Sequence, residues 1–320
     1  MDTIHRMDPL RLICEQHGFF TRAMARECGY SDKMVTAMVR GRIWHRFRRG
    51  YYSFCNIWST LDETERHLVR CRAVLHSLGD DVVLSHVSGV VAHRIAVWGG
   101  SLERVHVTRL DGDASRIEGD VVHHRGSVDD AEVMVIDGMR VLPPARCALE
   151  YASMVSGEAG LVTLDSVLHL DRCQRTDLFA QFARMEKWPG MRHVHVPIRL
   201  CSGRSESAGE SRGFWLFWSA GLPAPERQYE VRDGQGALRA TCDWGWPELD
   251  AYGEFDGKVK YGRLLKPGQD PGDVVFAEKQ REDEVRDITG GTMIRLIWAD
   301  YERPRVTIAR LERKLRRRAG

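Results

Sequence analysis

Hydrophobic residues recur at helical spacing in three short segments near the start of the chain, over residues 8–18, 19–29 and 30–42. The first two predicted helices stop at Gly18 and Gly29, and Thr21 and Ser31 stand where N-caps are expected. Bulky and basic residues then alternate around Gly50 in "IWHRFRRGYYSF", which predicts a two-stranded hairpin. Three helices followed by a hairpin are typical of a winged helix-turn-helix domain, predicted here over residues 1–56.

Residues 57–200 contain segments with helical spacing and segments with the alternation of strands. The pattern predicts an amphipathic helix over 60–79, a short strand and a helix over 82–99, strands over 104–110 and 120–126, and a helix after two prolines at 143–144. A mixed helix and strand middle domain is therefore predicted. Its histidines have no pair at the spacing of a known metal site on a helix, so no metal site is predicted there. These residues are His86, His93, His106, His123 and His124.

The last segment, residues 201–320, opens with the small, polar stretch "CSGRSESAGES", the predicted linker. A helix over 209–221, a hairpin with its turn at 233–236, a strand over 249–257, a helix from Asp270 and a strand over 292–301 follow. This order predicts an α/β sandwich with helices covering one face of a sheet. The expected fold class is thus α/β multidomain (α+β), with domains 1–56, 57–200 and 201–320.

Carboxylates gather in the predicted sheet of the last domain. Asp243 lies on one strand, and Glu254 and Asp256 lie two positions apart on the next, so both point to one face. Glu210, at the start of the preceding helix, is expected to reach the same place. Clustered carboxylates raise one another's pKa, so the cluster favours a divalent cation. Asp243, Glu254 and Asp256 are the predicted ligands of Mg²⁺ or Mn²⁺, because Mg²⁺ prefers oxygen ligands.

Charge is distributed unevenly along the chain. The net charge is +2, but residues 1–56 hold ten basic and five acidic residues, a difference of +5, and the last eleven residues are also basic. Basic ends favour a polyanionic partner. No apolar run approaches the roughly 18 residues of a membrane span, so no membrane partner is expected. The eight cysteines show no CxxC or zinc-ligand spacing, which is typical of reduced thiols in a cytoplasmic protein.

The stretch "HGFFTRAMARECGYSDKMVTAMVRGRIWHRFRRGYYSF" resembles the N-terminal domain of AbiEi-type antitoxins, which are winged-helix autorepressors. The resemblance covers about 50 residues and implies that double-stranded DNA is the partner, with a cognate nucleotidyltransferase-like toxin as a possible second one. It places four DNA-contacting residues on the recognition helix, namely Ser31, Lys33, Thr36 and Arg40. It places five in or near the wing, namely Arg42, His45, Arg46, Arg48 and Arg49.

Three short motifs of the last domain, "SAGE" (207–210), "DWGWPE" (243–248) and "EFDG" (254–257), resemble the PD-(D/E)xK nuclease superfamily. They are most similar to the domain family related to very-short-patch-repair endonucleases, over about 120 residues. The resemblance implies a restriction-endonuclease-like fold and a catalytic set at the carboxylates. The sequence departs from the superfamily pattern where Asp256 replaces a lysine, so Lys258 or Lys260 would have to serve instead.

Two functions follow from these features. The first is a DNA-binding antitoxin and transcriptional repressor with a nuclease-like C-terminal domain. The second is a Mg²⁺-dependent DNA endonuclease guided by the winged helix, with Glu210, Asp243, Glu254, Asp256 and Lys258 as its catalytic set. The alternative for the carboxylates is structural, with Asp243 and Glu254 capping turns or pairing with Arg281 and Arg286.

Overall fold

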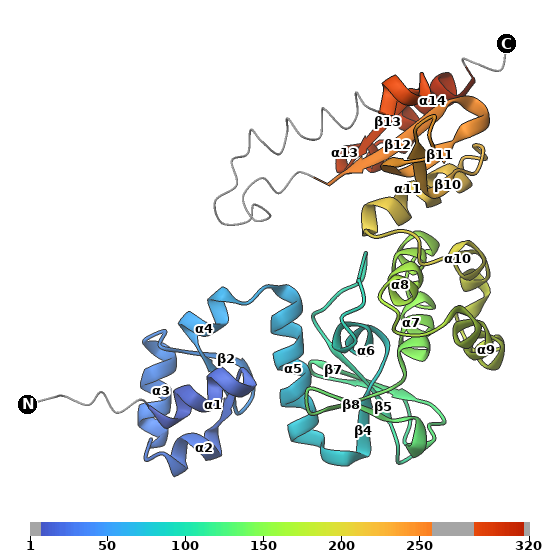
Figure 1. Ribbon diagram of the computed structural model, residues 1–320. Helices are drawn as coiled ribbons and strands as arrows, with labels where there is room; N and C mark the ends of the chain where they lie inside the picture. Colours follow the sequence, from blue (N-terminus) through green and yellow to red (C-terminus); the bar gives the residue numbers. More distant parts are fainter. Residues whose placement is uncertain (1–7, 258–284, 317–320) are drawn as a thin grey trace, which may run out of the picture. The chain divides into compact units, whose positions relative to one another are not determined.

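The computed structural model describes residues 8–257 and 285–316, and the chain divides into two compact units. Unit 1 comprises residues 1–155 and 176–191, and unit 2 comprises residues 156–175 and 192–320. Both contain helices and mixed sheets, so the protein is a multidomain α+β chain, as predicted (Figure 1). None of the helices in the described ranges has the length and apolar character needed to cross a membrane.

The beginning of unit 1 has the predicted order of helices and hairpin. Its elements are α1 (Pro9–His17), β1 (Phe20–Thr21), α2 (Arg22–Glu27), α3 (Asp32–Arg40), β2 (Trp44–Arg48) and β3 (Tyr51–Phe54). The strands form an antiparallel sheet in the order β1-β3-β2. Helix α1 ends at Gly18, whose φ of 82° is the left-handed conformation that glycine adopts without strain. Buried Leu10, Phe20, Val35 and Trp44 form the core beneath the three helices.

The rest of unit 1 is built around a six-stranded mixed sheet in the order β6-β7-β5-β4-β9-β8. Its strands are β4 (Val82–Leu84), β5 (Val105–Arg109), β6 (Arg116–Glu118), β7 (Val121–Arg125), β8 (Met134–Ile136) and β9 (Met139–Val141). Its helices are α4 (Cys55–Thr60), α5 (Glu63–Leu78), α6 (His86–Ala92), α7 (Pro144–Ala152) and α9 (Arg175–Met185). Strands β5 and β7 run parallel, and helix α6 packs against β5 and α7.

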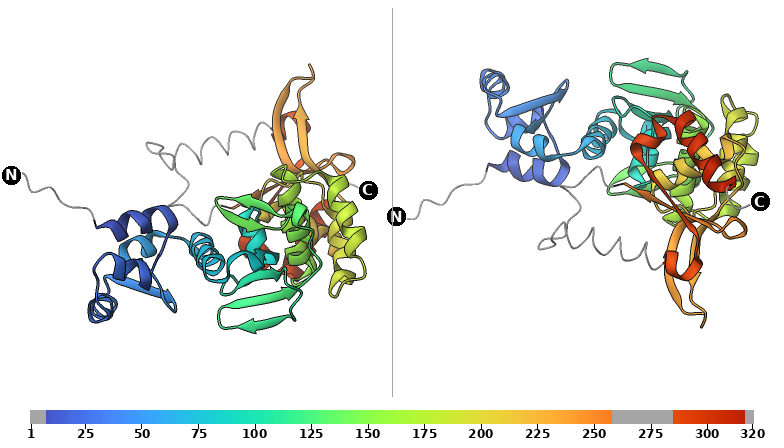
Figure 2. Two further views of the ribbon diagram at one scale, coloured as in Figure 1. Left: turned by 90° about the horizontal axis from the view of Figure 1, so that it is seen from below. Right: turned by 90° about the horizontal axis from the view of Figure 1, so that it is seen from above.

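Unit 2 holds a four-stranded sheet in the order β10-β11-β12-β13, with β12 and β13 parallel (Figures 1 and 2). The strands are β10 (Glu226–Arg232), β11 (Leu238–Trp246), β12 (Ala251–Asp256) and β13 (Thr292–Ile297). The helices are α8 (Gly157–His169), α10 (His195–Leu200), α11 (Ala208–Ser219), α13 (Trp298–Tyr301) and α14 (Pro304–Arg316). Helices α11 and α14 contact the sheet, and Phe217, Trp244, Trp246 and Leu311 share its core.

The two units differ from the three predicted domains in that residues 1–56 share a unit with most of the middle segment, while α8 belongs with the C-terminal sheet. A buried ion pair joins α8 to that sheet. Asp165 on α8 accepts two 3.0 Å hydrogen bonds from Arg227 on β10, and both side chains are buried. The same carboxylate accepts hydrogen bonds from the backbone of Ser202 and Gly203 and from the Ser211 hydroxyl. Residues 201–211 are therefore anchored to α8, whereas the sequence predicted a linker.

Two further expectations about unit 2 differ from the structure. The closing strand predicted over 292–301 ends at Ile297, where α13 begins. The basic C-terminal end belongs partly to helix α14, whose Leu311 and Leu315 are buried and whose Lys314 ammonium donates to the Met293 carbonyl at 2.8 Å. The predicted helix from Asp270 lies mostly outside the described residues, although 285–289 are helical.

Candidate functional site

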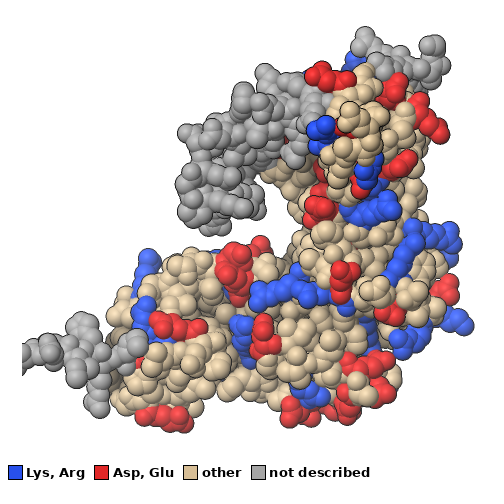
Figure 3. Space-filling view, viewed as in Figure 1, with Lys and Arg blue, Asp and Glu red and all other residues tan. Residues whose placement is uncertain are grey.

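Helix α3 and the β2–β3 hairpin carry the residues predicted to contact DNA. Lys33, Thr36 and Arg40 are exposed and lie three and four residues apart, so they share one face of α3. Arg42, in the turn after α3, and Arg46 and Arg49 in the hairpin are also exposed. Figure 3 shows basic side chains at the surface of the N-terminal part of the chain. Within residues 8–257 and 285–316, no carboxylate pairs with Lys33, Arg40, Arg42, Arg46 or Arg49.

The other predicted contact residues have internal partners. The Ser31 hydroxyl caps α3 by accepting from the Met34 amide, and the Thr36 hydroxyl donates to the Asp32 carbonyl at 2.8 Å. Arg48 forms an ion pair with Asp120, which lies between β6 and β7. No local pattern in the sequence could reveal this pair, because its members are 72 positions apart.

His45 is half-buried and stacks on Trp58, with 4.8 Å between the ring centroids. Burial lowers the pKa of His45, and Arg66 and Arg70 lower it further by repulsion. The imidazole is therefore neutral at pH 7 and adds no positive charge to the hairpin. The basic surface of the N-terminal region comes from its exposed lysine and arginines.

The carboxylates of unit 2 are brought together by α11, β11 and β12. The β11–β12 pairing matches Trp244 with Gly253, and the same register continued by one step places Asp243 beside Glu254. The Phe255 amide donates to the Asp243 carboxylate at 2.6 Å. Glu210, in the first turn of α11, is buried and accepts from the Ser207 hydroxyl at 2.7 Å. It also accepts from the Glu206 amide and the Gln228 side chain.

Two glycines let α11 approach the strands closely enough to bring Glu210 to this place. A Cβ atom at Gly209 would collide with the Phe255 ring, and one at Gly213 would collide with Trp244. The Tyr301 hydroxyl donates to the Gly209 carbonyl at 2.6 Å and fixes this end of the helix. Because these two glycines are four residues apart, they lie on the same face of α11. That face carries no side chains at these positions where it packs against the sheet.

The surroundings of Asp243 disfavour its charged form. Burial, and then the neighbouring Glu210 and Glu254, raise the pKa of Asp243 from 3.8 to about 7. The folded state therefore holds a proton on Asp243 between about pH 4 and pH 7, where the unfolded state has lost it. Its contribution to stability is consequently present at low pH and falls as the pH rises through this window.

The rest of the predicted catalytic set is less complete. The Asp256 carboxylate lies 3.9 Å from the guanidinium of Arg295. Lys258, Lys260 and Arg281 lie outside the described residues. Within the described ranges, one group of three side chains has ligand atoms that all lie within 4.8 Å of one another, and that group consists of histidines. These carboxylates do not form such a group. The structure therefore brings Glu210, Asp243 and Glu254 into one electrostatic cluster that is looser than a closed metal site.

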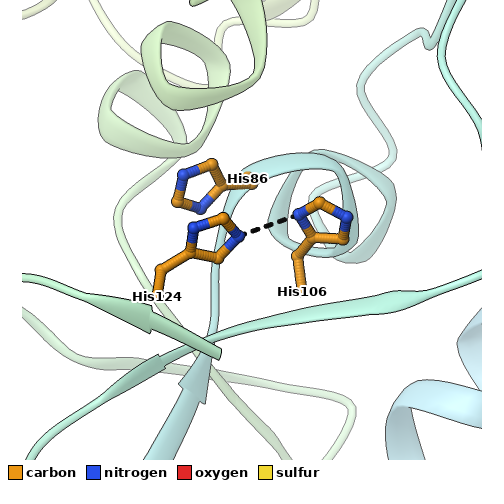
Figure 4. A group of neighbouring side chains, drawn as sticks. All are labelled: His86, His106 and His124. Carbon is orange, nitrogen blue, oxygen red and sulfur yellow. Dashed lines mark hydrogen bonds between the residues drawn. The ribbon is translucent and has the colours of Figure 1, made fainter. Parts of the chain in front are cut away.

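The histidine group lies in unit 1 and comprises His86, His106 and His124 (Figure 4). They come from the start of α6, from β5 and from β7, three elements that the sequence pattern did identify. The sequence predicts no metal site here, because these histidines lack the spacing of a ligand pair on one helix. Their proximity depends on the parallel β5–β7 pairing, which places His124 opposite Thr108, two residues from His106.

Comparisons with known proteins give no function. No protein-family model matches the chain. It is 29% identical over 136 residues to two proteins of Mycobacterium tuberculosis, "Uncharacterized protein MT2308" of strain CDC 1551 / Oshkosh and "Uncharacterized protein Rv2248" of strain ATCC 25618 / H37Rv. The match covers 42% of this chain and spans about half, 49%, of the length of those proteins. The crystal structure of the RV2827C protein from Mycobacterium tuberculosis is similar over 70% of this chain and 82% of its own, with 15% identity and a TM-score of 0.37.

Proposed function

We propose that the protein binds double-stranded DNA through helix α3 and the β2–β3 hairpin. The observation that supports this proposal is the group of five exposed basic side chains there, none paired with a described carboxylate. An unpaired arginine or lysine keeps its charge available for a phosphate, and releasing condensed counterions drives the binding. In a winged helix, α3 would enter the major groove while the hairpin follows the backbone.

The proposed DNA binding should depend steeply on salt. If the five basic residues each neutralise one phosphate, the slope of log affinity against log salt is roughly −4 to −5, a loss of several hundred-fold between about 50 and 200 mM NaCl. Fluorescence anisotropy of a labelled duplex, titrated with the full chain at several salt concentrations, measures this slope. A wild-type protein that shows no binding at the lowest salt, or a slope near zero, would refute the proposal.

The resemblance to AbiEi-type antitoxins extends this proposal to a repressor that acts on the cell's DNA in the cytoplasm. A repressor binds the duplex upstream of its own gene more tightly than an unrelated duplex of equal length. The same anisotropy measurement, run with both duplexes, tests that preference. A cognate nucleotidyltransferase-like toxin belongs to the same proposal, and co-purification with the product of the neighbouring gene tests it.

A second candidate function, metal-dependent DNA cleavage, is favoured by the crowding of Asp243 with Glu210 and Glu254. Asp243 and Glu254 would hold Mg²⁺ or Mn²⁺, which would activate water for phosphodiester hydrolysis. Glu210 already accepts three hydrogen bonds, so we assign it the role of fixing α11 against the strands. A cation would offset both the burial and the carboxylate repulsion that raise the pKa of Asp243.

The Asp243→Asn variant tests this second function with two measurements. In the absence of metal the variant should gain stability over the wild type at pH 8, by roughly 1–3 kcal/mol, and little at pH 4, because the amide carries no charge to bury. With Mn²⁺ the wild type should nick supercoiled plasmid and the variant should not. If the variant gains stability but the wild type does not nick the plasmid, the carboxylate cluster has a structural role only and the nuclease function is excluded.

A further inference from the structure

We propose that His86, His106 and His124 form a binding site for a transition metal ion of the Zn²⁺ class. The Nε2 atom of His124 lies 3.0 Å from the Nδ1 atom of His106. The ring of His86 stacks on that of His124, with 3.6 Å between the centroids. Ligand nitrogens of all three lie within 4.8 Å of one another. Two nitrogens of a tetrahedral zinc site lie roughly 3.3 Å apart. An ion lies in the plane of each ring that binds it, so binding requires the His86 ring to rotate out of its stacked position on His124.

The three imidazoles are in the protonation state that a metal requires. The pKa of each is lowered to about 3, mainly by burial, with contributions from neighbouring histidines for His106 and His124 and from Arg146 for His86. All three are consequently neutral at pH 7, and each has a nitrogen lone pair. Neutral imidazole is the form that binds Zn²⁺.

A buried carboxylate contacts one of the rings and orients it. The Nδ1 atom of His86 lies 3.4 Å from the buried carboxylate of Glu150 and 3.0 Å from the Ser85 hydroxyl. These two contacts fix the orientation of the His86 ring beside that of His124. Arg146 donates to the other Glu150 oxygen at 2.9 Å, which holds the carboxylate in place and balances its charge.

The backbone of His86 is held in an uncommon conformation. Its φ is +49°, in the left-handed region that non-glycine residues rarely adopt. The Glu150 carboxylate accepts from the His86 amide at 3.2 Å and so contributes to holding that conformation. Strain of this kind is often retained at functional sites, where it aims a side chain. Here it brings the His86 ring over that of His124.

The site has access to solvent and room for a further ligand. His86, His124 and Glu150 line a cavity of about 400 Å³ within unit 1, together with Thr108, Arg125 and Trp188. Three protein nitrogens leave one tetrahedral position for water or another ligand, which is the arrangement of catalytic rather than structural zinc sites. A metal held here would therefore present an open position to the cavity.

Metal binding to the full-length chain tests this proposal. After treatment with a chelator and its removal, titration with Zn²⁺ should show one equivalent bound per chain, and Co²⁺ should give the visible absorption of a tetrahedral nitrogen site. The His124→Gln variant should lose at least about 100-fold in affinity, more than the loss caused by removing a ligand's hydrogen-bonding partner. The His17→Gln variant is the control, because His17 is an exposed histidine of the same unit.

Several outcomes would overturn the proposal. One is a wild-type chain that binds neither ion stoichiometrically. Another is a His124→Gln variant that binds as the wild type does. A third is a Co²⁺ spectrum with thiolate charge-transfer bands, which would place the ion on cysteines. If the His124→Gln variant fails to fold, as judged by circular dichroism, the spectrum of the wild type decides alone, because it identifies nitrogen or sulfur ligands directly.

Discussion

Replacing Arg40 and Arg46 together with alanine is expected to weaken binding to duplex DNA by roughly 100-fold at constant salt. Loss of an arginine contact to DNA costs about 1–3 kcal/mol, and each phosphate contact removed reduces the salt slope by about 1. Both side chains are exposed and make no ion pair with a described residue, so their removal should leave the fold intact. Anisotropy titrations of the variant and the wild type measure the difference.

The matched control for this variant is Arg116→Ala. Arg116 is also an exposed arginine of unit 1, on β6, but it pairs with Asp113 and Glu118. Its removal should change DNA affinity by less than twofold. Equal losses in the control and in the Arg40/Arg46 variant would indicate a general charge effect and contradict an interface at α3 and the hairpin.

Replacing Asp165 with alanine is expected to destabilise unit 2 by about 3–5 kcal/mol, because it leaves the guanidinium of Arg227 buried without its counter-charge. The variant also removes the acceptor for the Ser202 and Gly203 amides, so residues 201–211 should detach from α8. Urea unfolding followed by tryptophan fluorescence measures the loss, since Trp244 and Trp246 are buried in the core of unit 2.

An exposed ion pair of the same unit provides the comparison. Glu230 and Arg232 pair on β10 with about half of each side chain exposed. Exposed ion pairs contribute little to the free energy of unfolding, so Glu230→Ala should shift the urea midpoint only slightly. If Asp165→Ala were as mild as Glu230→Ala, then α8 would not be anchored to the C-terminal sheet through this carboxylate.

Local patterns in the sequence predicted most elements and could not predict how distant residues meet. The caps at Thr21 and Ser31 and the stop at Gly18 were identified because each signal lies within a few residues of its effect. Helix α14 was missed. Its apolar positions, including Leu311 and Leu315, are embedded in a run of basic residues, and such a run indicates a charged end more strongly than a buried helix face.

The carboxylate cluster and the histidine group differ in the same way: local sequence patterns predict the first and not the second. Glu254 and Asp256 share a strand, and motif spacing placed Asp243 and Glu210 near them, so the carboxylate cluster could be anticipated. The histidine group could not be, because His86, His106 and His124 are 20 and 18 positions apart and meet through a parallel strand pairing. Such a pairing has no local sequence signal. The same holds for the Arg48–Asp120 ion pair, which pairs one of the arginines predicted to contact DNA with a carboxylate.

Hydrogen–deuterium exchange of the full chain, with and without a saturating DNA duplex at low salt, tests the DNA-binding proposal most directly. The account predicts slower exchange of backbone amides over residues 32–54, from α3 through the β2–β3 hairpin. Unchanged exchange in that segment while the duplex is bound, with protection confined to residues 206–256 of unit 2, would contradict it.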